Sequence, residues 1–216
     1  MTFTLVIGNK NYSSWSLRPW LAMRHLGVDF SEVQIALYTP ESSQHIRRYS
    51  PAGKVPVLLD DTITVWDSLA ILDYLAEGLP TLHWWPADKA ARAFARSISA
   101  EMHSGFQDLR HNMPMNCRAR LPGKGLTSAV QTDIDRITAI WRDCRQTFGT
   151  DGSLLFGQFT IADAMFAPVA LRFVTYDVPL DDVSRQYVDA ILALPALQEW
   201  LQAAGAEAER LPTFER

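Results

Sequence analysis

The sequence predicts an α+β protein in which a small mixed sheet with helices comes first and an all-helical bundle follows. Segments with strand character all lie before residue 80, where strands and helices alternate as βαβα and then ββα. After a proline-bounded connector at 78–86, apolar residues recur only at helical intervals. We therefore expect a sheet domain over residues 1–80, a linker over 81–87 and an all-helical domain over 88–216.

The first half opens with a strand, a helix and a second strand. Residues 3–7 form a β-favouring run closed by a Gly-Asn pair, which predicts a buried strand. Apolar residues at helical spacing over 15–26, followed by glycine, predict a helix. Looser alternation over 30–37 predicts the second strand, and 41–49 is typical of a short polar helix. A βαβ crossover of this kind places the two strands parallel in one sheet.

The stretch 50–74 combines a proline turn, a hairpin and the start of a helix. Pro56 cannot donate to a sheet and restrains Val55 toward an extended backbone, so the peptide groups of Val55 are free for a chain lying alongside. We expect the Val55-Pro56 bond to be cis. Strand-like runs at 57–59 and 62–65 flank an acidic turn and predict a hairpin.

Asp67 and Ser68 begin the helix that follows the hairpin, because apolar positions from residue 69 follow helical spacing. The Ser68 hydroxyl and the first free amides of this helix therefore lie where an anion can be held. Each of these pieces alone is common in an ordinary αβ unit with a capped helix.

Together and in this order, the proline step, the hairpin and the Asp-Ser helix start resemble the glutathione-binding half of cytosolic glutathione transferases. Within the family, the chain resembles serine-type bacterial members of theta or zeta character. The resemblance implies a thioredoxin-like domain over 1–80 and an all-α domain after it. It also implies glutathione as co-substrate and no metal.

Helical spacing also accounts for the second half. We expect one long helix over 88–113, stopped by Pro114, and a second over 127–148, which would pack as a bundle. Thr160 and Asp163 form a capping pair at the next helix start, and the expected role of Asp163 is in folding. An unordered polar tail follows three further predicted helices, over 164–175, 182–194 and 196–204.

The first loop carries the candidates for thiol activation. Serine-type members place the active serine before the first helix, with an arginine one turn later; Ser14 with Arg18 fits this pattern best, and Ser13 is second. The loop has no cysteine, which argues against the thiol-disulfide branches of the family. Ser14 could also be an ordinary helix N-cap, and that role is compatible with thiol activation. Where the zeta class has Ser-Ser-Cys, this chain has Tyr12-Ser13-Ser14-Trp15, which leaves the register and an isomerase assignment open.

The resemblance also assigns the glutathione-binding residues. The cysteinyl backbone of glutathione would pair with Val55, which Pro56 orients. The γ-glutamyl carboxylate would lie on Ser68, its amine near Asp67, and the glycyl carboxylate near Lys54. Asp67 as a plain N-cap, Ser68 as a first-turn serine and Lys54 as a surface lysine are the structural alternatives.

The second-substrate pocket is the least specified part of the predicted site. Met102, Phe106 and Arg110 stand at successive i, i+4 positions of the predicted long helix, and His103 and Tyr12 could approach them. Met102 and Phe106 suit the bundle core equally well. Arg110 would either hold an acidic substrate or cap the helix end.

Charge and composition argue against other classes of protein. A net charge of −4 and a pI near 5.7 do not suit a nucleic-acid partner. No apolar run approaches the roughly 20 residues of a membrane span, so we expect no membrane partner and a cytoplasmic protein. Cys117 and Cys144 are far apart, and free structural thiols are expected. The resemblance implies a homodimer, and the apolar connector residues Leu82, Trp84 and Trp85 favour buried surface.

The expected function is that of a glutathione S-transferase, which activates the glutathione thiolate for attack on a small hydrophobic electrophile. The alternatives are a glutathione-dependent isomerase of the maleylacetoacetate type, a peroxidase or dehalogenase, and a non-catalytic glutathione-binding stress protein. The catalytic alternatives need the same thiolate site and differ only in the second pocket, so the sequence does not separate them.

Overall fold

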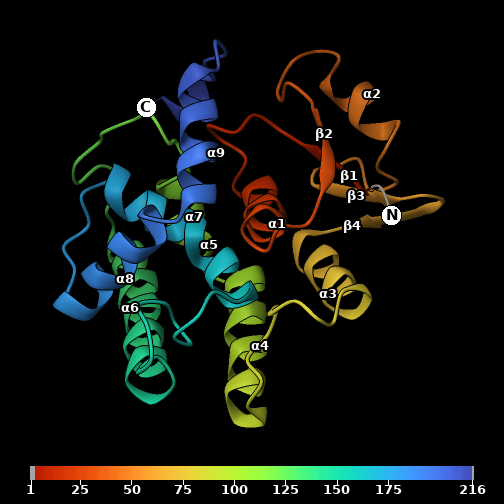
Figure 1. Cartoon of the computed structure of the whole chain (residues 1–216). Coiled ribbons are helices and arrows are strands. Elements are labelled where there is room, and N and C mark those ends of the chain that lie inside the picture. The colour runs from red at the N-terminus through yellow and green to blue at the C-terminus, as the bar shows by residue number, and fades with distance from the viewer. Residues whose placement is uncertain (1–2, 216) are drawn as a thin grey trace.

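The computed structural model describes residues 3–215 and contains one four-stranded sheet with helices on both faces (Figure 1). The strands are β1 (Phe3–Ile7), β2 (Phe30–Gln34), β3 (Val57–Asp60) and β4 (Ile63–Trp66). The helices of this half are α1 (Ser14–His25), α2 (Ser42–Arg47) and α3 (Ser68–Gly78). The sheet order is β2-β1-β3-β4, with β1 parallel to β2 and the other neighbours antiparallel. The predicted βαβαββα order and mixed sheet are confirmed.

Alternate residues of the central strands face opposite sides of the sheet. Leu5 and Leu58 belong to the main core, which also contains the apolar residues of α1 and α3. Val6 and Val57 point to the other face and pack with Ile46 of α2 in a smaller core. Accordingly, α2 and α3 lie on opposite sides of the strands in Figure 1. Because α1 follows β1 after a short loop, its N-terminus lies at the end of a buried central strand.

The prediction of one long helix over 88–113 was wrong in its last third. The structure has α4 (Lys89–Ser104) and then α5 (Gln107–Asn112). Gly105 leaves the helix with an extended backbone, and Phe106 has a left-handed φ of 59°, which ends the run of helical dihedrals. Apolar spacing continues through Phe106, which is buried, so spacing alone does not reveal the break.

The side chain of Arg110 closes the end of α4. Its guanidinium group folds back and donates to the carbonyl oxygens of Met102, His103 and Gly105. Carbonyl groups in the last turn of a helix have no partner within the helix, so these bonds satisfy them. Of the two roles considered for Arg110, helix capping is thus observed.

Four further α-helices follow α4 and α5 in the helical half. Nearly every residue of α7 is buried, and α7 packs against both α1 and α4 at the centre of the molecule. The predicted helices are present, with boundaries shifted by a few residues. They are α6 (Ser128–Thr147), α7 (Ile161–Thr175), α8 (Asp182–Leu192) and α9 (Pro195–Ala206).

Asp163 forms the predicted capping pair at the start of α7. One carboxylate oxygen accepts from the backbone N–H of Thr160 at 2.9 Å, and the other accepts from the N–H of Leu155 at 3.1 Å. The side chain is fully buried, and burial raises the pKa of Asp163 to about 6. The carboxylate therefore ties the loop before α7 to the helix itself, as expected for a residue with a role in folding.

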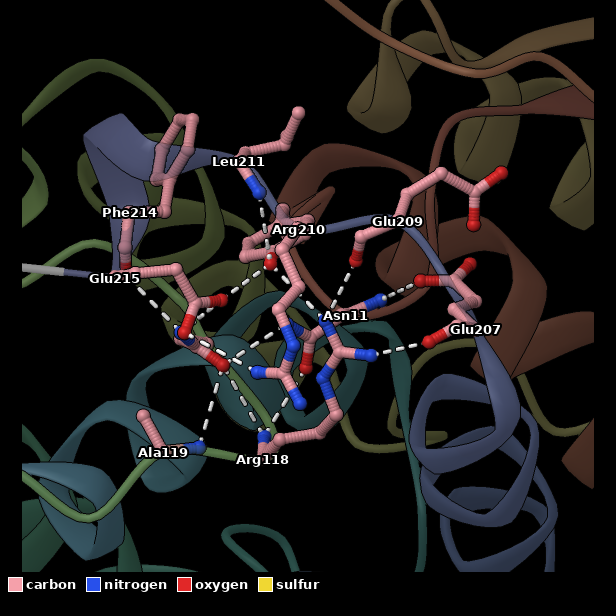
Figure 2. A network of polar contacts seen from close by, with 11 residues as sticks. Asn11, Arg118, Ala119, Glu207, Glu209, Arg210, Leu211, Phe214 and Glu215 are labelled. Carbon is pink, nitrogen blue, oxygen red and sulfur yellow. Dashed lines mark hydrogen bonds and ion pairs between the residues drawn. The ribbon is translucent and has the colours of Figure 1, made fainter.

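The polar tail that we expected to be unordered is ordered instead. Residues 207–215, here called the tail, include a short 3₁₀ helix and lie against the first loop (Figure 2). The Glu207 carboxylate accepts from the backbone N–H groups of Lys10 and Asn11 at 2.5 and 2.9 Å. Arg118 donates to the backbone carbonyls of Glu207 and Glu209. Polar bonds rather than apolar burial hold the tail, so its composition carried no signal of order.

The two tryptophans of the connector, which favoured a dimer in the sequence analysis, are not an exposed pair in the structure. Trp84 is buried within the chain, and its indole N–H donates to the carbonyl oxygen of Leu79 at 3.1 Å. Trp85 and Leu82 are partly buried against the same core. The connector therefore offers no exposed tryptophan pair for a partner subunit to cover.

Candidate active site

Two adjoining pockets open beside the N-terminus of α1. The larger, here called the main pocket, has a volume of about 630 Å³, and the smaller, the side pocket, has about 400 Å³. Trp15, Lys54 and Val55 line both, so the pockets meet there. Other residues of the main pocket include Tyr12, Ser13, Ser14, Arg110, Arg172 and Phe214. Those of the side pocket include Pro56, Trp66, Asp67, Ser68 and His103.

The Val55-Pro56 peptide bond between the pockets is cis, as predicted. Val55 lies just before β3, outside the sheet ladder. Within residues 3–215, no hydrogen bond engages its backbone N–H or C=O group, so both are open to a ligand. The neighbouring Lys54 has its own backbone N–H bonded to the Ser50 hydroxyl at 3.2 Å.

Ser14 is the first residue of α1 and lines the main pocket. Nη2 of Arg172 donates to its Oγ at 3.3 Å. Because this bond uses a lone pair of the oxygen, the Ser14 hydroxyl proton remains available to a ligand. The Oγ of Ser13 lies 2.7 Å from that of Ser16, so this hydroxyl already has a partner within the chain. Of the two serines, Ser14 has the freer donor.

The Tyr12 hydroxyl is occupied by the tail. It donates to the carboxylate of Glu215 and accepts from Arg118 at 3.0 Å and from the backbone N–H of Leu211 at 3.2 Å. Its proton is therefore not free for a ligand in the main pocket. The Tyr12 ring lies 5.5 Å from that of Phe214, and both rings line this pocket. Tyr12 thus contributes its ring to the wall and its hydroxyl to holding the tail.

Three arginines lie close to Trp15 and Ser14. The guanidinium groups of Arg18 and Arg110 are 4.3 and 4.6 Å from the Trp15 ring centroid, and that of Arg172 reaches Ser14. Burial lowers the pKa of all three, to about 9 for Arg172 and about 10 for Arg110. Between residues 3 and 215, no carboxylate comes within ion-pair distance of them. Because Arg110 and Arg172 line the main pocket, it has a positive floor that favours an anion.

The side pocket combines a helix N-terminus with an unpaired hydroxyl. Ser68, the first residue of α3, is 1% exposed, and its hydroxyl has no partner in the described part of the chain. Asp67 caps this helix, with Oδ1 accepting from the N–H groups of Leu69 at 2.9 Å and Ala70 at 3.3 Å. The N-cap alternative for Asp67 is thus observed. A buried free hydroxyl at the positive end of a helix is suited to a carboxylate.

His103 lies in the side pocket rather than in the main pocket. Its Nε2 is 3.0 Å from Oδ2 of Asp67, and its ring meets that of Trp15 edge to face at 5.3 Å. Burial lowers the pKa of His103, and the charge of Asp67 acts in the opposite direction. The ring is therefore neutral at pH 7 and donates from Nε2 to the carboxylate.

Met102 and Phe106 line neither pocket. Met102 is fully buried on α4, and Phe106 is buried at the start of α5, both in the main core. Arg110 lines the main pocket as well as capping α4. Of the five residues predicted for the second-substrate pocket, Tyr12 and Arg110 lie in the main pocket.

Among the main-pocket residues that sequence reasoning missed, Arg172, Trp15 and Phe214 matter most for the site. Arg172 is the one charged residue in the apolar stretch of α7 after Asp163. A lone charge in an apolar helix could have indicated a functional residue. Trp15 belongs to the loop already considered, but nothing in its spacing indicated that it lies between two pockets. Phe214 comes from the tail, whose polar composition did not indicate an ordered structure.

Within residues 3–215, no group of three His, Cys, Asp or Glu side chains is placed to hold a metal ion. Cys117 and Cys144 are free thiols in the same part of the chain, and burial raises the pKa of Cys117 to about 12. No helix of the described residues is long and apolar enough to cross a membrane.

The sheet and the helical bundle together define the two-domain class that begins with a thioredoxin-like unit. The family pattern "Glutathione S-transferase, N-terminal domain" matches residues 12–77, and "Glutathione S-transferase, C-terminal domain" matches residues 119–203. A probable maleylacetoacetate isomerase of Caenorhabditis elegans is 32% identical over 158 residues, which cover 72% of each chain. Maleylacetoacetate isomerase of Rattus norvegicus is 38% identical over 101 residues, 45% of this chain and 46% of that protein. The chain belongs to the glutathione S-transferase family.

Solved structures agree on the fold. A glutathione transferase homolog from Burkholderia, solved with bound glutathione, superposes with a TM-score of 0.72 at 24% identity and covers 96% of this chain and 100% of its own. Glutathione S-transferase unclassified 2 from Bombyx mori gives a TM-score of 0.73 at 18% identity, with 94% of each chain covered. At these identities the likeness establishes the fold alone.

Proposed function

We propose that this protein is a glutathione S-transferase that binds glutathione across the two pockets and activates its thiol with Ser14. The observation that carries the proposal is the Ser14 hydroxyl, which keeps a free proton in a pocket with a positive floor and next to the open Val55 backbone. The cysteinyl backbone of glutathione pairs with Val55, so its sulfur reaches Ser14.

The two ends of glutathione are assigned to matching groups. The γ-glutamyl carboxylate binds at the N-terminus of α3 and accepts from the Ser68 hydroxyl, which otherwise has no partner. The γ-glutamyl amine binds Asp67, the only acidic residue among residues 3–215 that lines the side pocket. The glycyl carboxylate binds Lys54, which lines both pockets.

Thiol activation then follows from charge. A free thiol has a pKa of about 8.5, so it is mostly protonated at pH 7. A hydrogen bond from Ser14 to the thiolate is worth about 1.5 to 3 kcal/mol and lowers the thiol pKa by about one to two units. The N-terminus of α1 and the guanidinium groups of Arg110 and Arg172 act in the same direction.

A glutathione-dependent isomerase is the second candidate function. The relatives named as maleylacetoacetate isomerases favour it, and so do the arginines of the main pocket, which suit an acidic substrate. Assays of the purified protein with an aromatic electrophile, a hydroperoxide and maleylacetone separate the transferase, peroxidase and isomerase reactions. Retention on immobilised glutathione, tested in parallel, is expected. If the folded protein is not retained and is inactive with all three, the proposal fails.

Ser68→Ala is expected to weaken glutathione binding about tenfold or more, because the γ-glutamyl carboxylate loses a hydroxyl donor that no other group replaces. Titration calorimetry with glutathione measures the effect. Ser99→Ala is the matched control, since the Ser99 hydroxyl is also buried and unpartnered in the described chain but lines neither pocket. Equal affinities of the Ser68→Ala variant and the wild type would contradict the assignment.

We further propose that the protein acts in the cytoplasm as a homodimer. Ile63 and Trp66 of the edge strand β4 are 48% and 46% exposed, an apolar edge that pairing would cover. Sedimentation equilibrium at micromolar concentration should give twice the chain mass of 24.3 kDa. A single species at the mass of one chain would exclude the dimer.

A further inference from the structure

The Asp67 carboxylate has two separate contacts within the chain. Oδ1 is committed to the N–H groups at the start of α3, and Oδ2 faces Nε2 of His103 at 3.0 Å. The two residues come from different halves of the molecule, because Asp67 precedes α3 and His103 is in the last turn of α4. The side pocket is therefore closed on one side by a bond between the sheet half and the helical half.

Asp67 depends on such contacts because its backbone is unusual. Its φ of 78° lies in the left-handed region, which a residue with a side chain adopts rarely and which surrounding contacts must stabilise. The bonds to α3 hold one oxygen of the carboxylate. The direction of the other oxygen is set by His103.

His103 is itself held in place. Its ring packs edge to face against Trp15, and the backbone carbonyl of His103 accepts from Arg110. Its Nδ1 is buried without a partner in the described chain, so Nε2 carries the proton and makes the only side-chain contact to a carboxylate. The ring is thus oriented to donate one hydrogen bond, to Asp67.

We infer that His103 is a positioning residue for the γ-glutamyl amine and acts through Asp67. By donating to Oδ2, His103 holds the carboxylate in the orientation in which its remaining lone pairs meet the ammonium group of glutathione. The inference rests on the proposed function, in which Asp67 binds that amine. It adds that recognition of the amine requires a residue from the helical half.

A chemical comparison isolates this role. Glutaryl-Cys-Gly has the glutathione skeleton without the γ-glutamyl amine, so it keeps every other contact. Calorimetry should give a clear preference of the wild type for glutathione over this analogue. His103→Leu removes the donor and should weaken glutathione about tenfold while changing the affinity for glutaryl-Cys-Gly less than twofold, so the preference shrinks. Asp67→Asn, which retains a capping oxygen, should abolish the preference.

His103→Gln is the rescue variant, because its amide nitrogen can take the place of Nε2 and restore the donor. It should recover glutathione affinity to within about threefold of the wild type. Equal weakening of both ligands by His103→Leu, or no weakening of either, would overturn the inference. A wild type that binds neither ligand would instead refute the proposed function. Unfolding midpoints of each variant verify that the comparison is made between folded proteins.

Discussion

Replacing Ser14 with alanine is expected to lower turnover at pH 7 about tenfold to a hundredfold with an aromatic electrophile. The variant loses the hydroxyl proton that is free at the start of α1, and the glutathione thiol pKa rises by the same one to two units. Glutathione binding should survive, since Ser68, Asp67 and Val55 are untouched. Activity should recover partly at higher pH, where the thiol ionises without help. A pH–rate profile of kcat/KM for both proteins measures the shift directly.

Ser13→Ala is the internal control for this experiment and should lose much less activity, because the Ser13 hydroxyl is paired with Ser16. If Ser13→Ala abolishes activity while Ser14→Ala resembles the wild type, the donor is the neighbouring serine. If neither change matters, backbone amides or the arginines alone stabilise the thiolate.

Asp163→Ala should produce the largest loss of stability, about 3 kcal/mol in the free energy of unfolding. The change removes a helix cap, worth about 1 kcal/mol, and leaves the buried N–H groups of Leu155 and Thr160 without an acceptor, which costs about 1 kcal/mol or more for each. Urea unfolding at pH 7 is the measurement. Asp181→Ala is the control: Asp181 is the N-cap of α8, accepts from the N–H of Ser184 at 3.0 Å and is partly exposed, so its loss should cost less than half as much. Equal costs would mean that burial adds nothing at Asp163.

The pH dependence of this effect has a definite sign. Burial raises the pKa of Asp163 to about 6 from an ordinary value of 3.8, so the folded protein binds this proton more tightly than the unfolded chain. The contribution of this group to stability is therefore greatest below pH 4 and declines as the pH rises to about 6. Asp163→Asn has no titrating group here, so the advantage of the wild type over it should be larger at pH 4.5 than at pH 7. A constant difference between the two proteins would show that the carboxyl group titrates normally.

The features that the sequence predicted correctly are those encoded by neighbouring residues. The proline step at Val55, the acidic hairpin turn and the helix start at Ser68 each follow from the backbone preferences of a few adjacent residues. The break between α4 and α5 was missed for the opposite reason. Gly105 was the one local indication of this helix break. The helical spacing of apolar residues continues to Phe106 and therefore suggested an unbroken helix.

The parts of the site that sequence reasoning missed depend on contacts between distant residues. Arg172 and Ser14 are 158 positions apart, and Tyr12 and Glu215 are 203 apart. No local pattern records which residue of a folded chain will meet another over such a separation. His103 shows the same limit. The sequence predicted its position on a helix, but it did not predict which of the two pockets the side chain would line.

The unpaired arginines beside Trp15 bear on how this protein could be engineered. Stabilising redesign replaces buried, uncompensated charges with apolar side chains, and Arg18, which is fully buried with no hydrogen-bond partner in the described chain, is an obvious target for it. Such a change would also remove part of the positive potential that the main pocket offers to an anion. Heat resistance and anion affinity are thus opposed at this position. A stabilised version of the protein is better sought at surface positions and helix ends of the helical half that line neither pocket.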